Sequence, residues 1–232
     1  MTARVKSAGR DESESGLSYR QQQAIATRRR IAAAARVVFA DQGYAAASIE
    51  SIASAAGVAT RTVYASFGTK KNILGAVCAL WLEDAQVAEI FRRGMDEPDP
   101  RKRLAVIPEA NRRQWEKGID VIRILQSAAT DDASVDRMLH GWMDDRSGGV
   151  REVLAGATEA YRPGMDLEIA MVVVRGLSVP ELYIELIGQG WTPDRYQSWL
   201  TETLDYQLLG RRPAFGWLKI ADLSPGLHQD SH

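Results

Sequence analysis

Apolar residues recur at intervals of three and four along most of this 232-residue chain, and this helical period is the strongest constraint on its fold. The first clear helix is expected from about residue 27 to Gly43, with an apolar face made of Ile31, Ala35, Val38 and Phe39. No alternating strand pattern lasts long enough to suggest a sheet, and no repeat is found. The sequence therefore predicts an all-α protein.

Capping residues and glycines divide the N-terminal third into short helices. Ser48 suits the N-cap of a second helix, and Gly57 tolerates the left-handed backbone of a tight turn after it. A third helix is expected over 60–67 and a fourth over 70–93. Two short helices joined by a glycine turn, with a small residue such as Ala53 where they cross, are typical of a helix-turn-helix.

The remainder is also predicted to be helical. Proline is expected to kink a helix over 101–117 at Pro108 and one over 167–188 at Pro180. Thr192 and Gly210 suit the start and stop of the last helix. A helix over 119–129 is predicted to be separated from the preceding one by Gly118. Residues 131–161 are predicted to form either one helix or two, divided at Ser147-Gly148-Gly149. We expect a disordered N-terminal arm at 1–22, a helix-turn-helix DNA-binding domain at 23–72, a helical effector-binding and dimerisation domain at 73–210, and an irregular C-terminal tail at 211–232.

Charge is divided unevenly along the chain. The whole chain has 29 Lys and Arg residues against 30 Asp and Glu residues, which alone would argue against a polyanionic partner. The first 72 residues, however, hold 11 basic and 5 acidic side chains, and the rest hold 18 and 25. The basic charge therefore coincides with the predicted helix-turn-helix, as phosphate binding requires.

Composition excludes several other classes of protein. The single Cys78 rules out an internal disulfide framework and any multi-cysteine metal site. The longest apolar runs are far shorter than the roughly 20 residues of a membrane-spanning helix, and the first 20 residues lack the apolar core of a signal peptide. We expect a soluble, cytoplasmic protein with no membrane association, metal or cofactor.

The third predicted helix offers a polar face to a ligand. With Val58 and Val63 turned inward, its outer face consists of Thr60, Arg61, Thr62, Tyr64 and Ala65. Short hydroxyls and one guanidinium on a narrow helix can reach base edges and phosphates in a major groove. This face is the predicted DNA-contacting surface.

The same segment resembles the DNA-binding domain of TetR/AcrR-type transcriptional regulators. The resemblance is carried by Thr27-Arg28-Arg29-Arg30-Ile31, Phe39, Gly43-Tyr44, Ser48-Ile49-Glu50-Ser51-Ile52-Ala53, Ala56-Gly57-Val58 and Thr62-Val63-Tyr64-Ala65-Ser66-Phe67-Gly68-Thr69-Lys70-Lys71-Asn72-Ile73-Leu74. It implies an all-helical homodimer with three N-terminal helices on DNA, a linking fourth helix, and a C-terminal domain that binds a small molecule and dimerises through its last two helices.

The resemblance also implies roles for single residues within the helix-turn-helix at 48–67 and just after it. The implied DNA-binding set is Ser48, Thr60, Arg61, Thr62, Tyr64 and Lys70. Tyr64 and Lys70 match phosphate-contacting positions, and Thr62 a position that reaches backbone or base. Thr60 and Arg61 match the variable, sequence-reading positions. The chain departs from the family at Ser66, where His or Tyr is frequent, and at Lys71, where an acid is frequent.

Effector-binding residues are harder to recognise. The candidates are Trp115, Met138, Trp142 and Tyr183, bulky side chains that suit an apolar or aromatic effector but equally suit an ordinary core. Apolar residues in excess of one buried stripe over 167–188 and 199–209 favour a dimer built from these helices.

The predicted function is that of a repressor released from operator DNA by a small-molecule effector. The alternative is a helical ligand-binding protein or an enzyme without specific DNA binding. Against an enzyme, His140 has no partner at metal-ligand spacing, and adjacent carboxylates such as Asp144 and Asp145 diverge by about 100° on a helix. We therefore expect no catalytic residues.

Overall fold

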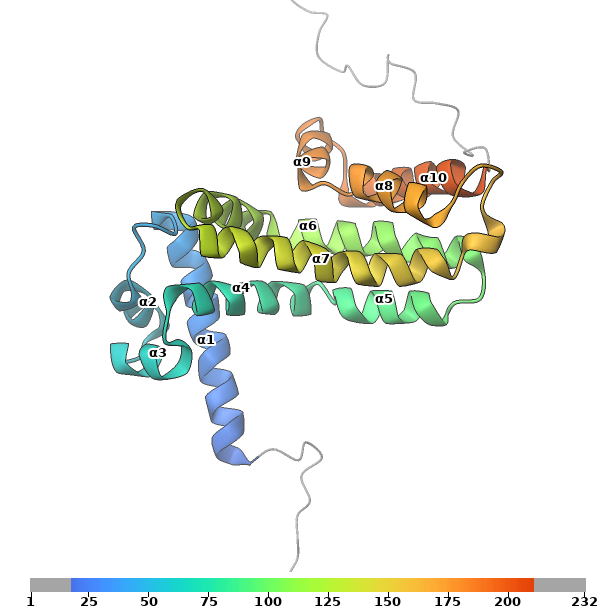
Figure 1. Cartoon of the computed structure of the whole chain (residues 1–232). Coiled ribbons are helices and arrows are strands. Elements are labelled where there is room, and N and C mark those ends of the chain that lie inside the picture. Colours follow the sequence, from blue (N-terminus) through green and yellow to red (C-terminus); the bar gives the residue numbers. More distant parts are fainter. Residues whose placement is uncertain (1–17, 211–232) are drawn as a thin grey trace, which may run out of the picture.

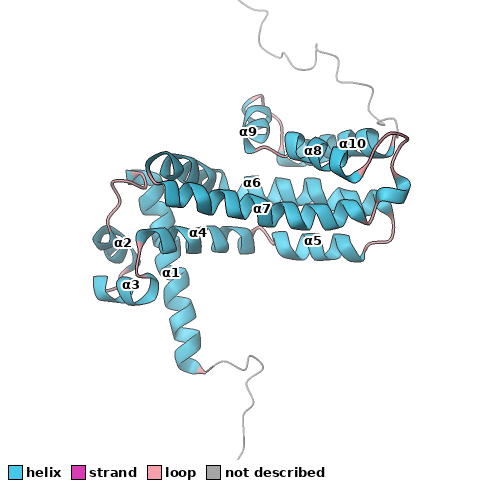
Figure 2. Cartoon of the chain, viewed as in Figure 1, coloured by secondary structure: helices cyan, strands magenta, loops and turns pink. Residues whose placement is uncertain are grey.

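The computed structural model describes residues 18–210, and every regular element in that range is helical (Figures 1 and 2). The predicted all-α class is therefore confirmed. The predicted N-terminal arm lies largely, and the C-terminal tail entirely, outside the described residues. The elements are α1 (Tyr19–Gln42), α2 (Ile49–Ala56), α3 (Thr60–Phe67), α4 (Lys70–Asp84), α5 (Val87–Asp96), α6 (Pro100–Asp131), α7 (Ala133–Ala155), the short 3-10 helix η1 (Thr158–Ala160), α8 (Leu167–Leu177), α9 (Pro180–Gly188) and α10 (Pro193–Leu209).

The helices form a small N-terminal part and a larger C-terminal part. Helices α1–α3, here called the head, lie at one end, and α4 runs from them into the body formed by α5–α10 (Figure 1). The long α6 packs against α4, α5, α7 and α10. It also contacts α1, so the head and the body are joined through α6 as well as through α4.

Local sequence signals place the short helices where they were expected. Ser48 caps α2 in a reciprocal pair with Ser51, and α3 occupies the predicted residues. Thr192 caps α10, and Gly210 ends it in the left-handed conformation. These boundaries depend on neighbouring residues alone, which is why sequence reasoning located them.

The predicted fourth helix is divided in two. Its backbone leaves the helical path at Gln86, which has φ 57° although it is not glycine, so α4 ends at Asp84 and α5 begins at Val87. The Gln86 side chain accepts a hydrogen bond from Arg113 of α6. The break between α4 and α5 is therefore accompanied by a contact with α6. The apolar pattern of residues 70–93 does not indicate this break.

The break in α6 lies at Gly118 and not at Pro108. The predicted break at Gly118 is confirmed by its non-helical angles (φ −153°, ψ 28°) within α6, whereas Pro108 lies inside the helix and does not split it. A Cβ atom added at Gly118 would lie 1.9 Å from Nε1 of Trp81. Trp81 of α4 occupies that space, so the packing of α4 on α6 requires glycine there.

Other helix boundaries differ because of caps and prolines. Helix α1 begins at Tyr19, eight residues before the predicted start, since Ser18 and Gln21 form a capping box. Pro180 does not bend a continuous helix but occupies the first turn of the separate α9. Helix α7 continues through Gly148 and Gly149 without a break.

A continuous apolar core runs from the head into the body. In α4 it includes Leu74, Val77 and Trp81, which connect the buried side chains of α1 to those of α6. Cys78 is fully buried in this core, and burial raises the pKa of its thiol far above the ordinary value. Within residues 18–210, no helix is both long and apolar enough to span a membrane.

Candidate nucleic-acid interface

The turn between α2 and α3 has helix-turn-helix geometry. Gly57 adopts φ 62° and ψ 40°, a left-handed conformation that a side chain would disfavour. The amide of Val58 donates to the carbonyl of Ala53 at 3.0 Å, which closes the end of α2. Ala53 and Val63 are fully buried between the helices, so the crossing is fixed by small and β-branched side chains as predicted.

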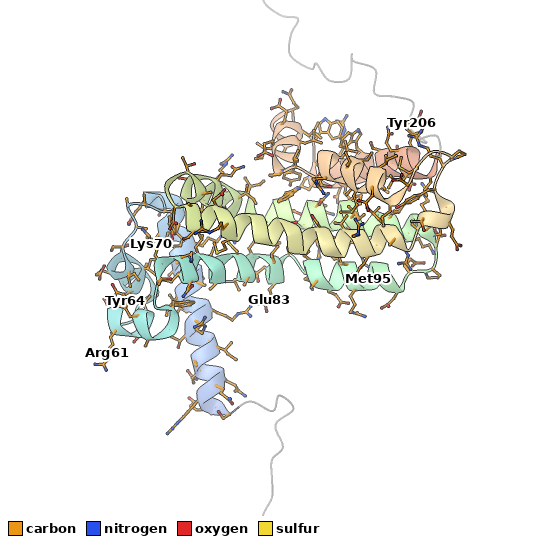
Figure 3. All side chains as sticks on the ribbon, viewed as in Figure 1. Arg61, Tyr64, Lys70, Glu83, Met95 and Tyr206 are labelled. Atoms are coloured by element: carbon orange, nitrogen blue, oxygen red, sulfur yellow. The ribbon has the colours of Figure 1, made fainter. Side chains whose placement is uncertain are left out.

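The outer face of α3 is open to solvent. Arg61 and Ala65 are exposed, the Tyr64 side chain is 50% exposed, and Thr60 and Thr62 are half-buried. Figure 3 shows Arg61 extending outward from α3. Tyr64 is therefore not part of the core, and its hydroxyl is available to a ligand. Contact of these residues with DNA remains a prediction.

Ser48 and Lys70 lie at the ends of the helix-turn-helix and have intramolecular partners. The Ser48 hydroxyl accepts from the Ser51 amide at 3.0 Å. The Lys70 ammonium donates to the carbonyls of Tyr44, Ala45 and Ala47, all within 3.0 Å. These three acceptors, in the loop between α1 and α2, were not foreseen from the sequence.

The arginine run of α1 is divided between intramolecular contacts and solvent. The Arg28 guanidinium lies 4.3 Å from the Phe67 ring centroid and donates to the Ser66 carbonyl, so it holds the end of α3. Arg29 forms an ion pair with Glu83 of α4 at 2.7 Å. Arg30 is exposed.

One arginine connects the head to the break in α6. Arg36 of α1 donates to the carboxylate of Asp120 at 2.6 Å and to the Lys117 carbonyl at 2.7 Å. Burial by itself would raise the pKa of Asp120, but hydrogen bonding and charge from Arg36 lower it below the ordinary value. Arg36 thus contacts α6 on both sides of Gly118.

Trp81 connects α4 to the same break. Its Nε1 donates to the Gln114 carbonyl at 2.8 Å. In a regular helix the carbonyls of Gln114 and Lys117 would accept hydrogen bonds from the amides four residues later. The non-helical backbone at Gly118 disturbs this pattern of hydrogen bonds. Side chains from α1 and α4 therefore supply donors at a joint in α6.

The four effector candidates do not form one cluster. Trp115 is 2% exposed, and its ring centroid lies 6.4 Å from that of Trp81. Tyr183 is buried edge-on against Tyr196, with ring centroids 4.9 Å apart. Met138 is half-buried, and the side chain of Trp142 lies outside the described residues.

Sequence reasoning missed the buried polar residues of α6. Asn111 is fully buried and donates from Nδ2 to the Ser178 hydroxyl at 2.7 Å. Gln114 is 4% exposed, and its Oε1 has no hydrogen-bond partner among the described residues. Asn111 lies four residues from both buried Ile107 and buried Trp115, and Gln114 lies four residues from buried Ala110. Their helical spacing from buried apolar residues was therefore a usable signal.

Part of the N-terminal region matches a known family. Residues 31–77 match the family described as bacterial regulatory proteins, tetR family. No curated protein sequence matches the chain.

Solved structures with a similar fold are regulators. The fatty acid degradation regulator FadR from Bacillus halodurans is 19% identical with a TM-score of 0.63, over 77% of this chain and 94% of that one. NalD, the secondary repressor of the MexAB-OprM multidrug efflux pump in Pseudomonas aeruginosa, is 21% identical with a TM-score of 0.62, over 81% and 98%. FadR from Bacillus subtilis in complex with stearoyl-CoA is 18% identical with a TM-score of 0.59, over 75% and 96%.

At these identities the similarity to solved structures is one of fold. The segment matched by sequence contains the whole helix-turn-helix, α2 and α3, and the helices around it follow the same architecture as those regulators. The head therefore carries a segment of the tetR family of bacterial regulatory proteins, and the chain has the fold of the regulators named above.

Proposed function

We propose that the chain is a repressor that binds operator DNA as a homodimer and releases it when a small molecule binds the body. The observation that carries this proposal is the outward face of α3, where Arg61 and Tyr64 are exposed opposite the buried Val63 and Phe67. A short helix with a buried apolar face and an exposed polar face suits insertion into a major groove. NalD, named as a repressor, supports this sense of regulation.

Two copies of the head are needed for tight binding. One α3 makes few contacts, whereas two heads about 34 to 36 Å apart reach successive major grooves. Helix α8 exposes Ile169 and Val172, three residues apart on one face, which supports dimerisation through α8. Leu200, Leu204 and Leu208 of α10 are buried within the subunit, so the interface of α10 is formed by its other faces.

The effector site is proposed within the body. Buried aromatic residues such as Trp115 and Tyr183 provide apolar surface, and the unpartnered Oε1 of Gln114 provides an acceptor. An unpaired buried acceptor is costly, so a ligand with a hydrogen-bond donor would relieve that cost. The effector is accordingly an apolar or aromatic molecule that carries such a donor.

A fluorescence titration tests the effector proposal. Because Trp81 and Trp115 pack together in the core, a bound ligand is expected to change tryptophan emission in a saturable way. The panel should contain hydroxylated aromatic compounds, fatty alcohols and acyl-CoA thioesters. If no compound in the panel gives a saturable change, the proposed apolar effector is rejected.

The joint at Gly118 supplies a route from effector to DNA. A shift of α6 on ligand binding would act on α1 through Arg36 and on α4 through Trp81. Since α1 and α4 flank the helix-turn-helix, either movement changes the separation of the two recognition helices. The ligand then favours dimers in which the separation of the two recognition helices no longer matches the spacing of the operator half-sites.

The domain division follows from this arrangement. We assign DNA binding to residues 23–72 and effector binding with dimerisation to residues 73–210. The protein acts on the chromosome in the cytoplasm.

The alternative, a helical ligand-binding protein or enzyme without specific DNA binding, makes the opposite prediction in one experiment. Repeated selection of duplexes from a random-sequence library should enrich a palindromic motif, and failure to enrich any motif would favour the alternative.

Substitution of Arg61 tests the recognition face directly. Arg61→Ala is expected to lower affinity for the selected operator by about thirtyfold to ten-thousandfold and to relax preference at one base pair of each half-site, because the dimer loses two arginine to guanine contacts at about 1–3 kcal/mol each. Competition binding with single-base operator variants measures this. Tyr64→Phe is the comparison, since loss of a phosphate contact weakens all sequences equally. Unchanged base preference in Arg61→Ala would contradict the assignment.

A further inference from the structure

Lys70 has an unusual set of partners for a residue expected to meet DNA. Its Nζ donates to the carbonyls of Tyr44 at 2.6 Å, Ala45 at 3.0 Å and Ala47 at 2.9 Å. Nζ also lies 4.7 Å from the centroid of the Tyr44 ring. An ammonium group has three N–H donors, and three carbonyls use all of them. A phosphate would have to displace one of these bonds.

The position of Lys70 makes these contacts energetically meaningful. Lys70 is the first residue of α4, directly after the cap Thr69. The N-terminus of a helix carries partial positive charge, so a cation there is disfavoured. Three carbonyl dipoles directed at the ammonium offset that repulsion. The positive charge of Lys70 therefore stabilises its contact with the loop.

The three carbonyls belong to the loop that leads into the helix-turn-helix. The loop follows α1 and ends at Ser48, the cap of α2, so its position sets where α2 begins. Tyr44 in this loop is buried against Phe39, with ring centroids 5.3 Å apart. Lys70 therefore connects the start of α2 to the start of α4.

A neighbouring side chain makes the matching connection to α3. Asn72 donates from Nδ2 to the Phe67 carbonyl at 2.7 Å, at the end of α3. The first turn of α4 thus holds the entry to α2 through Lys70 and the exit from α3 through Asn72. With both ends held, the orientation of the recognition helix depends on α4.

We propose that Lys70 is a positioning residue of the DNA-binding head, whose ammonium fixes the loop at 43–47, and with it α2, against α4 instead of neutralising an operator phosphate. The proposal rests on the proposed function, because its consequence is measured as operator binding. It replaces the phosphate contact implied by family resemblance with an intramolecular role derived from the contacts of this chain.

Salt dependence distinguishes the two roles of Lys70. The protein is full-length, and the probe is the duplex selected from the random library. Lys70→Met is expected to lower operator affinity about tenfold if only about one dimer in ten keeps both heads correctly placed. The slope of log K against log salt concentration should stay at the wild-type value. Loss of one phosphate contact per subunit would instead reduce that slope by about 1.8 for a dimer, and this result would overturn the proposal.

Lys70→Arg provides a second, independent measurement. Arginine keeps the charge and suits phosphates well, but its planar fork does not match three carbonyls that converge on one atom. We expect Lys70→Arg to lose affinity as Lys70→Met does, and wild-type affinity in Lys70→Arg would contradict the positioning role.

Hydrogen exchange of the loop amides completes the test. Lys71→Met is the matched control, since it removes the same charge from the same helical turn without touching the loop carbonyls. Exchange at 43–48 should accelerate in both Lys70 variants and stay at the wild-type rate in Lys71→Met. Equal rates in all four proteins would overturn the proposal. If wild-type protein enriches no duplex, the proposed function fails, whereas the exchange result still reports on the loop.

Discussion

Gly118→Ala is expected to lower the free energy of unfolding by about 3 kcal/mol, because the new methyl group enters a space already filled by Trp81. The added Cβ would lie 1.9 Å from Nε1 and 2.3 Å from Cε2 of that indole, well inside contact distance. The ring is buried and bonded to the Gln114 carbonyl, so it cannot move away freely. Urea denaturation at constant protein concentration measures the change.

The matched control is a glycine inside another helix. Gly148 of α7 is exposed, and nothing lies within 4 Å of a Cβ added there. Gly148→Ala should stabilise the protein by about 0.5–1 kcal/mol, the ordinary effect of alanine in a helix.

A double-mutant cycle assigns the effect to Trp81. Trp81→Phe removes Nε1, the atom nearest the new methyl group, so Gly118→Ala should cost less in the Trp81→Phe background than in the wild type. An equal cost in both backgrounds would show that the clash with Trp81 is not the cause.

The same substitution should reach the DNA-binding head. Arg36 bonds the Lys117 carbonyl and Asp120 on either side of Gly118, so displacement of this joint alters the attachment of α1. Weaker operator binding by the folded fraction of Gly118→Ala is therefore expected. Wild-type affinity in that fraction would indicate that the joint does not transmit to the head.

Val172→Glu is expected to raise the dimer dissociation constant by about a hundredfold. The Val172 side chain is 66% exposed on α8, beside Ile169, so an isolated subunit leaves it largely in water. In a two-fold dimer each substitution acts twice and introduces two carboxylates into one apolar interface. Sedimentation equilibrium measures the constant, and operator binding should fall with it because a monomer presents a single recognition helix.

Val37→Glu controls for the loss of an exposed valine. Val37 of α1 is 59% exposed and lies outside α8 and α10. Its substitution should leave the dissociation constant unchanged. Equal weakening by both variants would locate the interface elsewhere or indicate a general effect of added charge.

Short-range signals explain how much of the head was predictable. Ser48 at the cap of α2, Gly57 in the turn and the apolar spacing of α3 act within a few residues of one another, so the sequence alone located both helices. The spacing also identified the outward face with Arg61 and Tyr64. The resemblance to tetR-family regulators was carried by the same segment, which the family match overlaps.

Long-range contacts account for what was missed. Lys70 meets carbonyls up to 26 residues away, and Arg36 meets Asp120 at a separation of 84 residues. The effector candidates were equally hard to judge, since a buried tryptophan or tyrosine has the same helical spacing in a core and in a pocket. Periodicity identifies which face of a helix is buried but not which helix covers it.

The sequence by itself determined the all-helical class, the helix-turn-helix and its polar face, because capping, glycine turns and apolar period are local properties of the chain. Only the tertiary structure decided that Trp81 and Arg36 meet the break in α6, that Gln86 separates α4 from α5, and that Lys70 is directed inward. The physical reason is that each of these features has its partners on another element, and those partners are brought together only when the helices pack.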